Sequence, residues 1–217
     1  MLLAIRCRLR SFGITASRPR SWLLRALLVI IPVMDIDKKA VSTKLLWVDL
    51  EMTGLDVNEH VIIEVAAEVT DWTFKTLASY EAVIRQPEEV MERSNPWAKD
   101  QHAKSGLAER VRTEGRPEQD VIHELVGFIQ AQFGDEPAVL AGNSIHNDRA
   151  FIKKWWPEVD NLLHYRMLDV SSWKLVMQGK YGVTFDKNDM HRAFDDIQAS
   201  IAELQYYLEW LRDYDHS

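Results

Sequence analysis

Residues 45–54 have the sequence LLWVDLEMTG, and this stretch decides how the chain folds. Its large apolar side chains predict a buried β-strand, which two acidic residues interrupt. Because successive strand side chains point to opposite faces, Asp49 and Glu51 share one face. At roughly 5 Å and an effective dielectric constant of about 20, their charges repel by about 3 kcal/mol. Either both acids face water at the strand end, or they bind a divalent cation through oxygen ligands.

This strand, at about 44–51, is the first of three. Short connections to strands at 61–70 and 76–85 predict an antiparallel meander, and Gly54 in the first connection is free to adopt a positive φ. The remaining pattern predicts helices at 117–132, 147–156, 171–179 and 192–211, and strands at 137–141 and 165–170. We therefore expect an α/β fold with a mixed five-stranded sheet, its first three strands antiparallel, flanked by helices.

Charge is distributed unevenly along the 217 residues. Residues 1–34 contain six arginines and no acid, which leaves 20 basic and 33 acidic side chains, a net charge of −13, for the remainder. An acidic body argues against binding long nucleic acids over a broad basic surface. The single cysteine, Cys7, excludes a disulfide within the chain and fits a reducing compartment.

We interpret residues 1–43 as an N-terminal extension and residues 44–217 as one domain. The arginine-rich, acid-free start has the composition of a mitochondrial transit peptide. It could also be a disordered or spurious extension, with Met34 as the true start, or a poor secretory signal. Its apolar run at 26–34 is too short to span a bilayer, so no membrane partner is expected.

Further acidic residues lie at the starts of two later predicted helices. Asp148 falls in the first turn of the helix at 147–156, where it either joins the site or only interacts with the helix dipole. His191, Asp195 and Asp196 surround the start of the last helix. Because helical positions five apart point about 140° apart, His191 can meet Asp196 only from the preceding loop. Alternatively, His191 caps the helix and both acids face water.

The order of these acids and the histidine resembles the DEDDh group of 3′–5′ exonucleases, which have a ribonuclease H-like fold. Short strings carry the resemblance over about 44–211, at 47–56, 105–107, 141–145, 164–171 and 191–197. They are closest to the branch of the group that degrades short oligoribonucleotides. Gln198-Ala199 departs from the usual pattern, and residues 180–189 match poorly, but neither departure touches a proposed ligand.

The resemblance implies that Asp49, Glu51, Asp148 and Asp196 hold two Mg²⁺ ions, with Mn²⁺ as the other candidate. It also implies that His191 is the general base that takes a proton from the attacking water. The family pattern favours Asp196 over Asp195 as the ligand, whereas spacing alone does not decide between them.

Substrate contacts follow from the same resemblance. Leu55 and Trp97 match residues that wedge and stack terminal bases, and His102 and Ser144 match residues near the backbone or the terminal phosphate. Leu55 could instead merely hold its turn, and Trp97 could be a core residue.

The resemblance also implies a homodimer. Tyr165 and Arg166 match residues that reach the substrate of the neighbouring subunit, with Tyr165 contributing to catalysis there. In the alternative reading, both residues simply begin a strand.

We therefore expect a metal-dependent 3′–5′ exoribonuclease that degrades short single-stranded RNA, down to dinucleotides, to nucleoside 5′-monophosphates. One alternative is a broader DEDDh exonuclease acting on RNA tails or DNA 3′ ends, and another is a binding module of the same fold without catalysis. The expected location is the cytoplasm, or the mitochondrion if residues 1–34 are a transit peptide.

Overall fold

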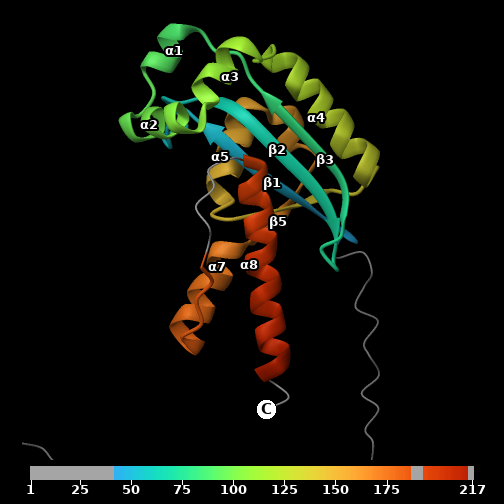
Figure 1. The fold of residues 1–217 in the computed structure, drawn as a ribbon. Coiled ribbons are helices and arrows are strands. Elements are labelled where there is room, and N and C mark those ends of the chain that lie inside the picture. Colours follow the sequence, from blue (N-terminus) through green and yellow to red (C-terminus); the bar gives the residue numbers. More distant parts are fainter. Residues whose placement is uncertain (1–41, 187–192, 215–217) are drawn as a thin grey trace, which may run out of the picture. The chain divides into compact units, whose positions relative to one another are not determined.

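The computed structural model describes residues 42–186 and 193–214. Five strands form one sheet in the order β3-β2-β1-β4-β5 (Figure 1). They are β1 (Lys44–Met52), β2 (Ile62–Asp71), β3 (Thr76–Val83), β4 (Ala138–Gly142) and β5 (Leu163–Asp169). β1, β2 and β3 pair antiparallel, whereas β4 and β5 run parallel to β1. The predicted mixed sheet with an antiparallel first half is therefore confirmed.

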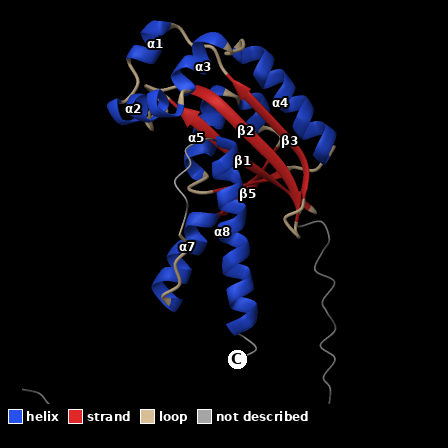
Figure 2. Ribbon diagram, viewed as in Figure 1, coloured by secondary structure: helices blue, strands red, loops and turns tan. Residues whose placement is uncertain are grey.

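Helices lie on both faces of this sheet (Figure 2). Residues of α4 (Glu118–Phe133) and α5 (His146–Trp155) pack on one face, and residues of α8 (Ala193–Tyr214) pack on the other. The short α6 (Pro157–Asp160) follows α5, and α7 (Val170–Val176) continues into a π-helical turn, η1 (Met177–Tyr181). All four predicted helices are present, with ends displaced by a few residues.

The alternation of side chains along β1 divides the core in two. Leu46 and Val48 are buried among the apolar residues of α4 and α5. Leu45 and Trp47 are buried on the opposite face, beneath α8, where the Trp47 Nε1–H donates to Thr70 Oγ1 at 2.9 Å. The acids of β1 continue this second stripe, so packing of α8 on β1 determines what faces them.

Three short helices between β3 and α4 were not predicted from the sequence. They are α1 (Glu88–Glu92), α2 (Pro96–Ser105) and α3 (Leu107–Thr113). In α2 the buried residues are Ala98 and His102, which is too little to give an apolar stripe. The local signals were nevertheless present, because Asn95 is a favourable N-cap and Pro96 suits a first helical turn.

Among the described residues, no helix combines the length and the apolar character needed to cross a membrane. The interpretations of residues 1–34 and of a boundary after residue 43 concern residues that lie largely outside the described part of the chain. They stay predictions.

Candidate active site

Three carboxylates from two distant parts of the chain meet at the end of β1. Asp49 and Glu51 lie on the strand, and Asp196 lies in the first turn of α8. One oxygen of each side chain lies within 4.8 Å of the others, and all three residues are partly buried. Because Ile197 and Ile201 of α8 pack over this face of β1, formation of the core brings Asp196 to the strand acids.

The negative charges of these three acids repel one another. Two carboxylates within 4.8 Å of each other repel by about 3 kcal/mol or more at an effective dielectric constant of about 20. His102 of α2 contacts one of them, with its Nε2 3.2 Å from Glu51 Oε2. A donor set made only of carboxylate oxygens suits hard divalent cations. The cluster could therefore hold a metal ion, which would remove the repulsion.

Asp148 occupies the gap that opens beside β1 where β4 ends. β1 pairs with β4 at residues 45–47, and the N–H of Leu50 donates instead to Asp148 Oδ1 at 2.9 Å. Asp148 lies in the first turn of α5, as predicted, and is 6% exposed. Burial raises the pKa of Asp148 to about 7; the bond from Leu50 opposes this rise, and the nearby charge of Glu51 adds to it.

A fifth carboxylate lies behind the cluster with its own counter-ion. Glu64 of β2 is the register partner of Glu51 and is buried. Burial raises the pKa of Glu64, and the Arg110 guanidinium, whose Nη1 donates to Glu64 Oε1 at 2.7 Å, opposes that rise. Arg110 also binds Glu81 and Glu114. The charge of Arg110 is thus shared among Glu64, Glu81 and Glu114.

A cavity of about 320 Å³ opens beside Glu51. Its lining includes Leu55, which is 73% exposed, and Trp97, which is 68% exposed. The alternative that Trp97 is a core residue is therefore wrong. His102 also lines the cavity, although it is buried. Two large apolar side chains held in solvent next to a polar cluster are typical of a ligand-binding surface.

Thr53 ties the two walls of this cavity together. Its backbone oxygen accepts a bond from Asn95 N at 2.7 Å, and Asn95 Oδ1 in turn accepts one from Trp97 N at 3.0 Å. The Thr53 hydroxyl accepts a bond from Val61 N at 3.1 Å, which closes the turn that carries Leu55. Neither Thr53 nor Asn95 was predicted from the sequence, although an Asn-Pro pair before Trp97 is a helix-start signal.

The role predicted for Gly54 needs correction. Among the described residues, Gly54 is not one of the glycines with positive φ. A glycine is needed here because a Cβ at this position would lie only 2.4 Å from the ring of His60. The imidazole Nδ1 of His60 lies 3.2 Å from Thr53 Oγ1, so the ring packs over the turn and holds it closed.

Ser144 lies in a strained loop between β4 and α5. Its φ of 48° is left-handed, a conformation that costs a non-glycine residue about 1–2 kcal/mol. Two contacts hold it there, because its N–H is shared between Asp169 Oδ1 at 3.0 Å and Ser171 Oγ at 2.9 Å. Asp169 and Ser171, which the sequence analysis did not single out, therefore fix the loop that precedes Asp148.

Tyr165 and Arg166 lie on β5, an edge strand of the sheet, and neither lines the cavity beside Glu51. Tyr165 is 74% exposed, with its ring 4.5 Å from that of His164 and 5.3 Å from the Arg166 guanidinium carbon. They do form part of a strand, as the alternative interpretation proposed. Their exposure leaves them accessible to another molecule.

Two other predicted residues lie elsewhere. His191, the predicted general base, is outside the described residues. Asp195 lines a separate cavity with Glu81, Arg110 and Phe194, whereas Asp196 joins the strand acids. The geometry therefore distinguishes two neighbouring acids that spacing could not.

Solved structures of exonucleases share this fold. Exonuclease I of E. coli in complex with a dT13 oligonucleotide gives a TM-score of 0.57 at 15% identity, covering 80% of this chain and 43% of that one. Exonuclease I from Methylocaldum szegediense gives 0.54 at 16% identity, covering 74% and 39%. The chain thus spans less than half the length of these proteins. The likeness establishes the fold, and the predicted ribonuclease H-like architecture is confirmed.

Sequence comparison defines the family. An exonuclease family profile matches residues 46–204. Oligoribonuclease of Francisella tularensis subsp. tularensis (strain WY96-3418) is 41% identical over 172 residues, which cover 78% of this chain and 97% of the relative. Oligoribonuclease of Vibrio campbellii (strain ATCC BAA-1116) is 44% identical over 169 residues, covering 76% and 93%. The chain therefore belongs to the exonuclease family and, within it, to the oligoribonucleases, which are 3′–5′ exoribonucleases.

The burial of Asp148 predicts how stability depends on pH without divalent cations. Its pKa is about 7 in the folded chain against a reference of 3.8, so the unfolded chain loses this proton first as pH rises. Asp148 should therefore cost stability increasingly from about pH 4 to pH 7, on the order of 4 kcal/mol in full. Asp148→Asn keeps an acceptor for Leu50 and should melt at a higher temperature than the unsubstituted protein at pH 8 in EDTA.

The comparison at pH 4 is the control, since Asp148 is then neutral in the folded protein and little of its cost remains, so the two melting temperatures should lie close together. A difference that stays the same from pH 4 to pH 8 would contradict this account of Asp148.

Proposed function

We propose that this protein hydrolyses short single-stranded oligoribonucleotides, down to dinucleotides, from the 3′ end and releases nucleoside 5′-monophosphates with the help of two Mg²⁺ ions. The observation that carries the proposal is the convergence of Asp49, Glu51 and Asp196 beside a cavity walled by Leu55 and Trp97. Membership of the oligoribonuclease family supports it. Mn²⁺ has similar ligand preferences and is the other candidate ion.

The four acids would share the work of holding the ions. Asp49, Glu51 and Asp196 present clustered oxygens, and Asp148 would act from the start of α5. When bound, divalent cations lower the pKa of water and stabilise the leaving oxygen of a phosphodiester. His102 would keep Glu51 oriented through its 3.2 Å contact, and it lines the cavity in which a phosphate would lie. His191 is proposed as the general base from the family pattern.

A preference for short chains follows from the surface. The cavity of about 320 Å³ is at the small end of the range for small-molecule sites, about 300–1,000 Å³. Leu55 and Trp97 offer apolar contact and stacking for bases, which need no extended basic surface. A chain with 20 basic and 33 acidic residues after position 34 is poorly suited to following a long backbone. This disfavours the broader exonuclease on RNA tails or DNA ends.

We further propose a homodimer in which Tyr165 acts in the neighbouring site and Arg166 binds the substrate there. β5 is an edge strand whose Tyr165 and Met167 side chains are exposed, and such edges are usually covered. Neither Tyr165 nor Arg166 lines the cavity of its own chain. We place the enzyme in the cytoplasm, or in the mitochondrion if residues 1–34 prove to be a transit peptide; the mass of the mature N-terminus would decide.

Purified protein with Mg²⁺ and a 5′-phosphorylated diribonucleotide should release nucleoside 5′-monophosphates, as measured by liquid chromatography. Asp49→Asn should reduce kcat by at least about a hundredfold because one ligand is lost, while metal-free stability stays equal or rises as repulsion is relieved. Asp195→Asn is the matched control and should retain activity. Faster cleavage of chains of ten or more nucleotides would favour the broader exonuclease, and no Mg²⁺-dependent rise in melting temperature would favour a binding module.

Trp97→Ala should raise KM for the dinucleotide by roughly tenfold, since stacking of a base on an aromatic ring contributes about 1–3 kcal/mol. Trp72→Ala is a suitable control, because Trp72 is also exposed but does not line the cavity. Equal KM values for both variants would exclude Trp97 from substrate binding.

A subunit-mixing experiment tests the shared site. Asp49→Asn and Tyr165→Ala should each be nearly inactive, but an equimolar mixture, after subunit exchange, should recover about one quarter of the wild-type activity. Half of the dimers are then mixed, and each carries one intact site. If the mixture stays as inactive as its components although exchange is verified by mass spectrometry, Tyr165 does not act across a dimer.

A further inference from the structure

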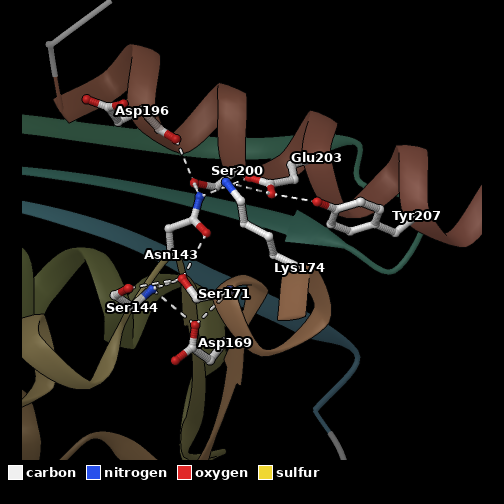
Figure 3. A network of polar contacts seen from close by, with 9 residues as sticks. All are labelled: Asn143, Ser144, Asp169, Ser171, Lys174, Asp196, Ser200, Glu203 and Tyr207. Atoms are coloured by element: carbon white, nitrogen blue, oxygen red, sulfur yellow. Dashed lines mark hydrogen bonds and ion pairs between the residues drawn. The ribbon is translucent and has the colours of Figure 1, made fainter. Parts of the chain in front are cut away.

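A chain of hydrogen bonds links the start of α8 to the loop before α5 (Figure 3). At its centre is Asn143, immediately after β4. The Asn143 Nδ2 donates to Ser200 Oγ at 2.9 Å, and the Ser200 hydroxyl donates to the backbone oxygen of Asp196 at 2.7 Å. On the other side, Ser171 Oγ donates to Asn143 Oδ1 at 3.2 Å.

The direction of each hydrogen bond in this network is fixed. Because the Ser200 hydroxyl proton goes to Asp196, its oxygen must accept from the Asn143 amide. Because the Ser171 proton goes to Asn143, its oxygen accepts the N–H of Ser144 at 2.9 Å. The orientation of the Asn143 amide is thereby fixed from both ends. A rotated amide would place acceptor against acceptor at Ser200 and donor against donor at Ser171.

The surroundings make this arrangement costly to disturb. Glu203, one turn further along α8, is fully buried, and its Oε2 lies 3.4 Å from Asn143 Nδ2. Its Oε1 accepts the Tyr207 hydroxyl at 2.8 Å and lies 3.7 Å from Lys174 Nζ. Because a buried carboxylate is destabilised when it loses a donor, a sliding of α8 relative to Asn143 would cost Glu203 this contact.

We propose that Asn143 is a positioning residue that sets where Asp196 stands relative to Asp49 and Glu51. It reaches the backbone carbonyl of Asp196 through one hydroxyl, and it contacts neither the cavity nor the three clustered carboxylates. The inference rests on the proposed function, because it takes Asp196 to be a metal ligand. It adds a fixed link between α8 and the β4–α5 loop. These two elements lie on opposite sides of β1, and each would help to place a metal ligand.

The test measures magnesium binding without substrate. Melting temperatures are recorded over a Mg²⁺ titration, and urea unfolding in EDTA gives the stability of each variant. Asn143→Ala and Ser200→Ala should each raise the midpoint of the Mg²⁺ response about tenfold, the effect expected of a group that orients a ligand. The double variant should be little worse than either single one, because both substitutions break the same chain.

Tyr207→Phe is the matched control. It removes a buried hydrogen bond from the same helix and should lower stability to a similar degree, but it leaves the link to Asp196 intact, so its Mg²⁺ midpoint should not move. If Asn143→Ala fails to fold, Ser200→Ala decides alone, since alanine is a good helix former.

Unchanged Mg²⁺ midpoints in Asn143→Ala and Ser200→Ala, or an equal shift in Tyr207→Phe, would show that the network is merely structural and overturn the proposal. A wild-type protein that binds dinucleotide but shows no Mg²⁺ response would overturn the proposed metal-dependent function, and this inference with it.

Discussion

The pleat of β1 is the constraint on which the rest of this structure depends. Side chains at positions 45, 47, 49 and 51 must share a face, because a strand repeats every two residues. The first two are apolar and are buried under α8, and the last two are acids. The packing that makes the core therefore also delivers Asp196, at the start of α8, to the strand acids. One stripe of side chains on β1 therefore supplies both core residues and acids of the candidate site.

A second constraint follows from the different lengths of β1 and β4. β4 is the shorter strand, so β1 extends past it and Leu50 has a free N–H at the edge of the ladder. Asp148 satisfies that donor and is buried as a result, with a raised pKa. A shorter β1 would need no such residue. The backbone bond thus holds a buried carboxylate beside Glu51.

Much of this could be predicted from the sequence, and particular residues show why. The strands and the long helices have strong apolar periodicity, so β1 and α8 were predicted nearly in full, as was the helical position of Asp148. The short α2 has almost no apolar face, and its existence depends on local capping and on contact with β1 through His102. Thr53 and Asn143 act through hydrogen bonds between segments far apart in sequence, which no local pattern encodes.

Two buried carboxylates outside the cluster have cationic side chains beside them. Glu64, the register partner of Glu51, has Arg110 at 2.7 Å, and the buried Glu203 has Lys174 at 3.7 Å. Asp49 and Asp196 lie close to Glu51, which contacts the imidazole of His102. Glu64 and Glu203 thus each have a cationic side chain beside them, and the three clustered acids lie close to one another. The mutual repulsion of three carboxylates gathered in one place is the physical reason for proposing a bound cation there.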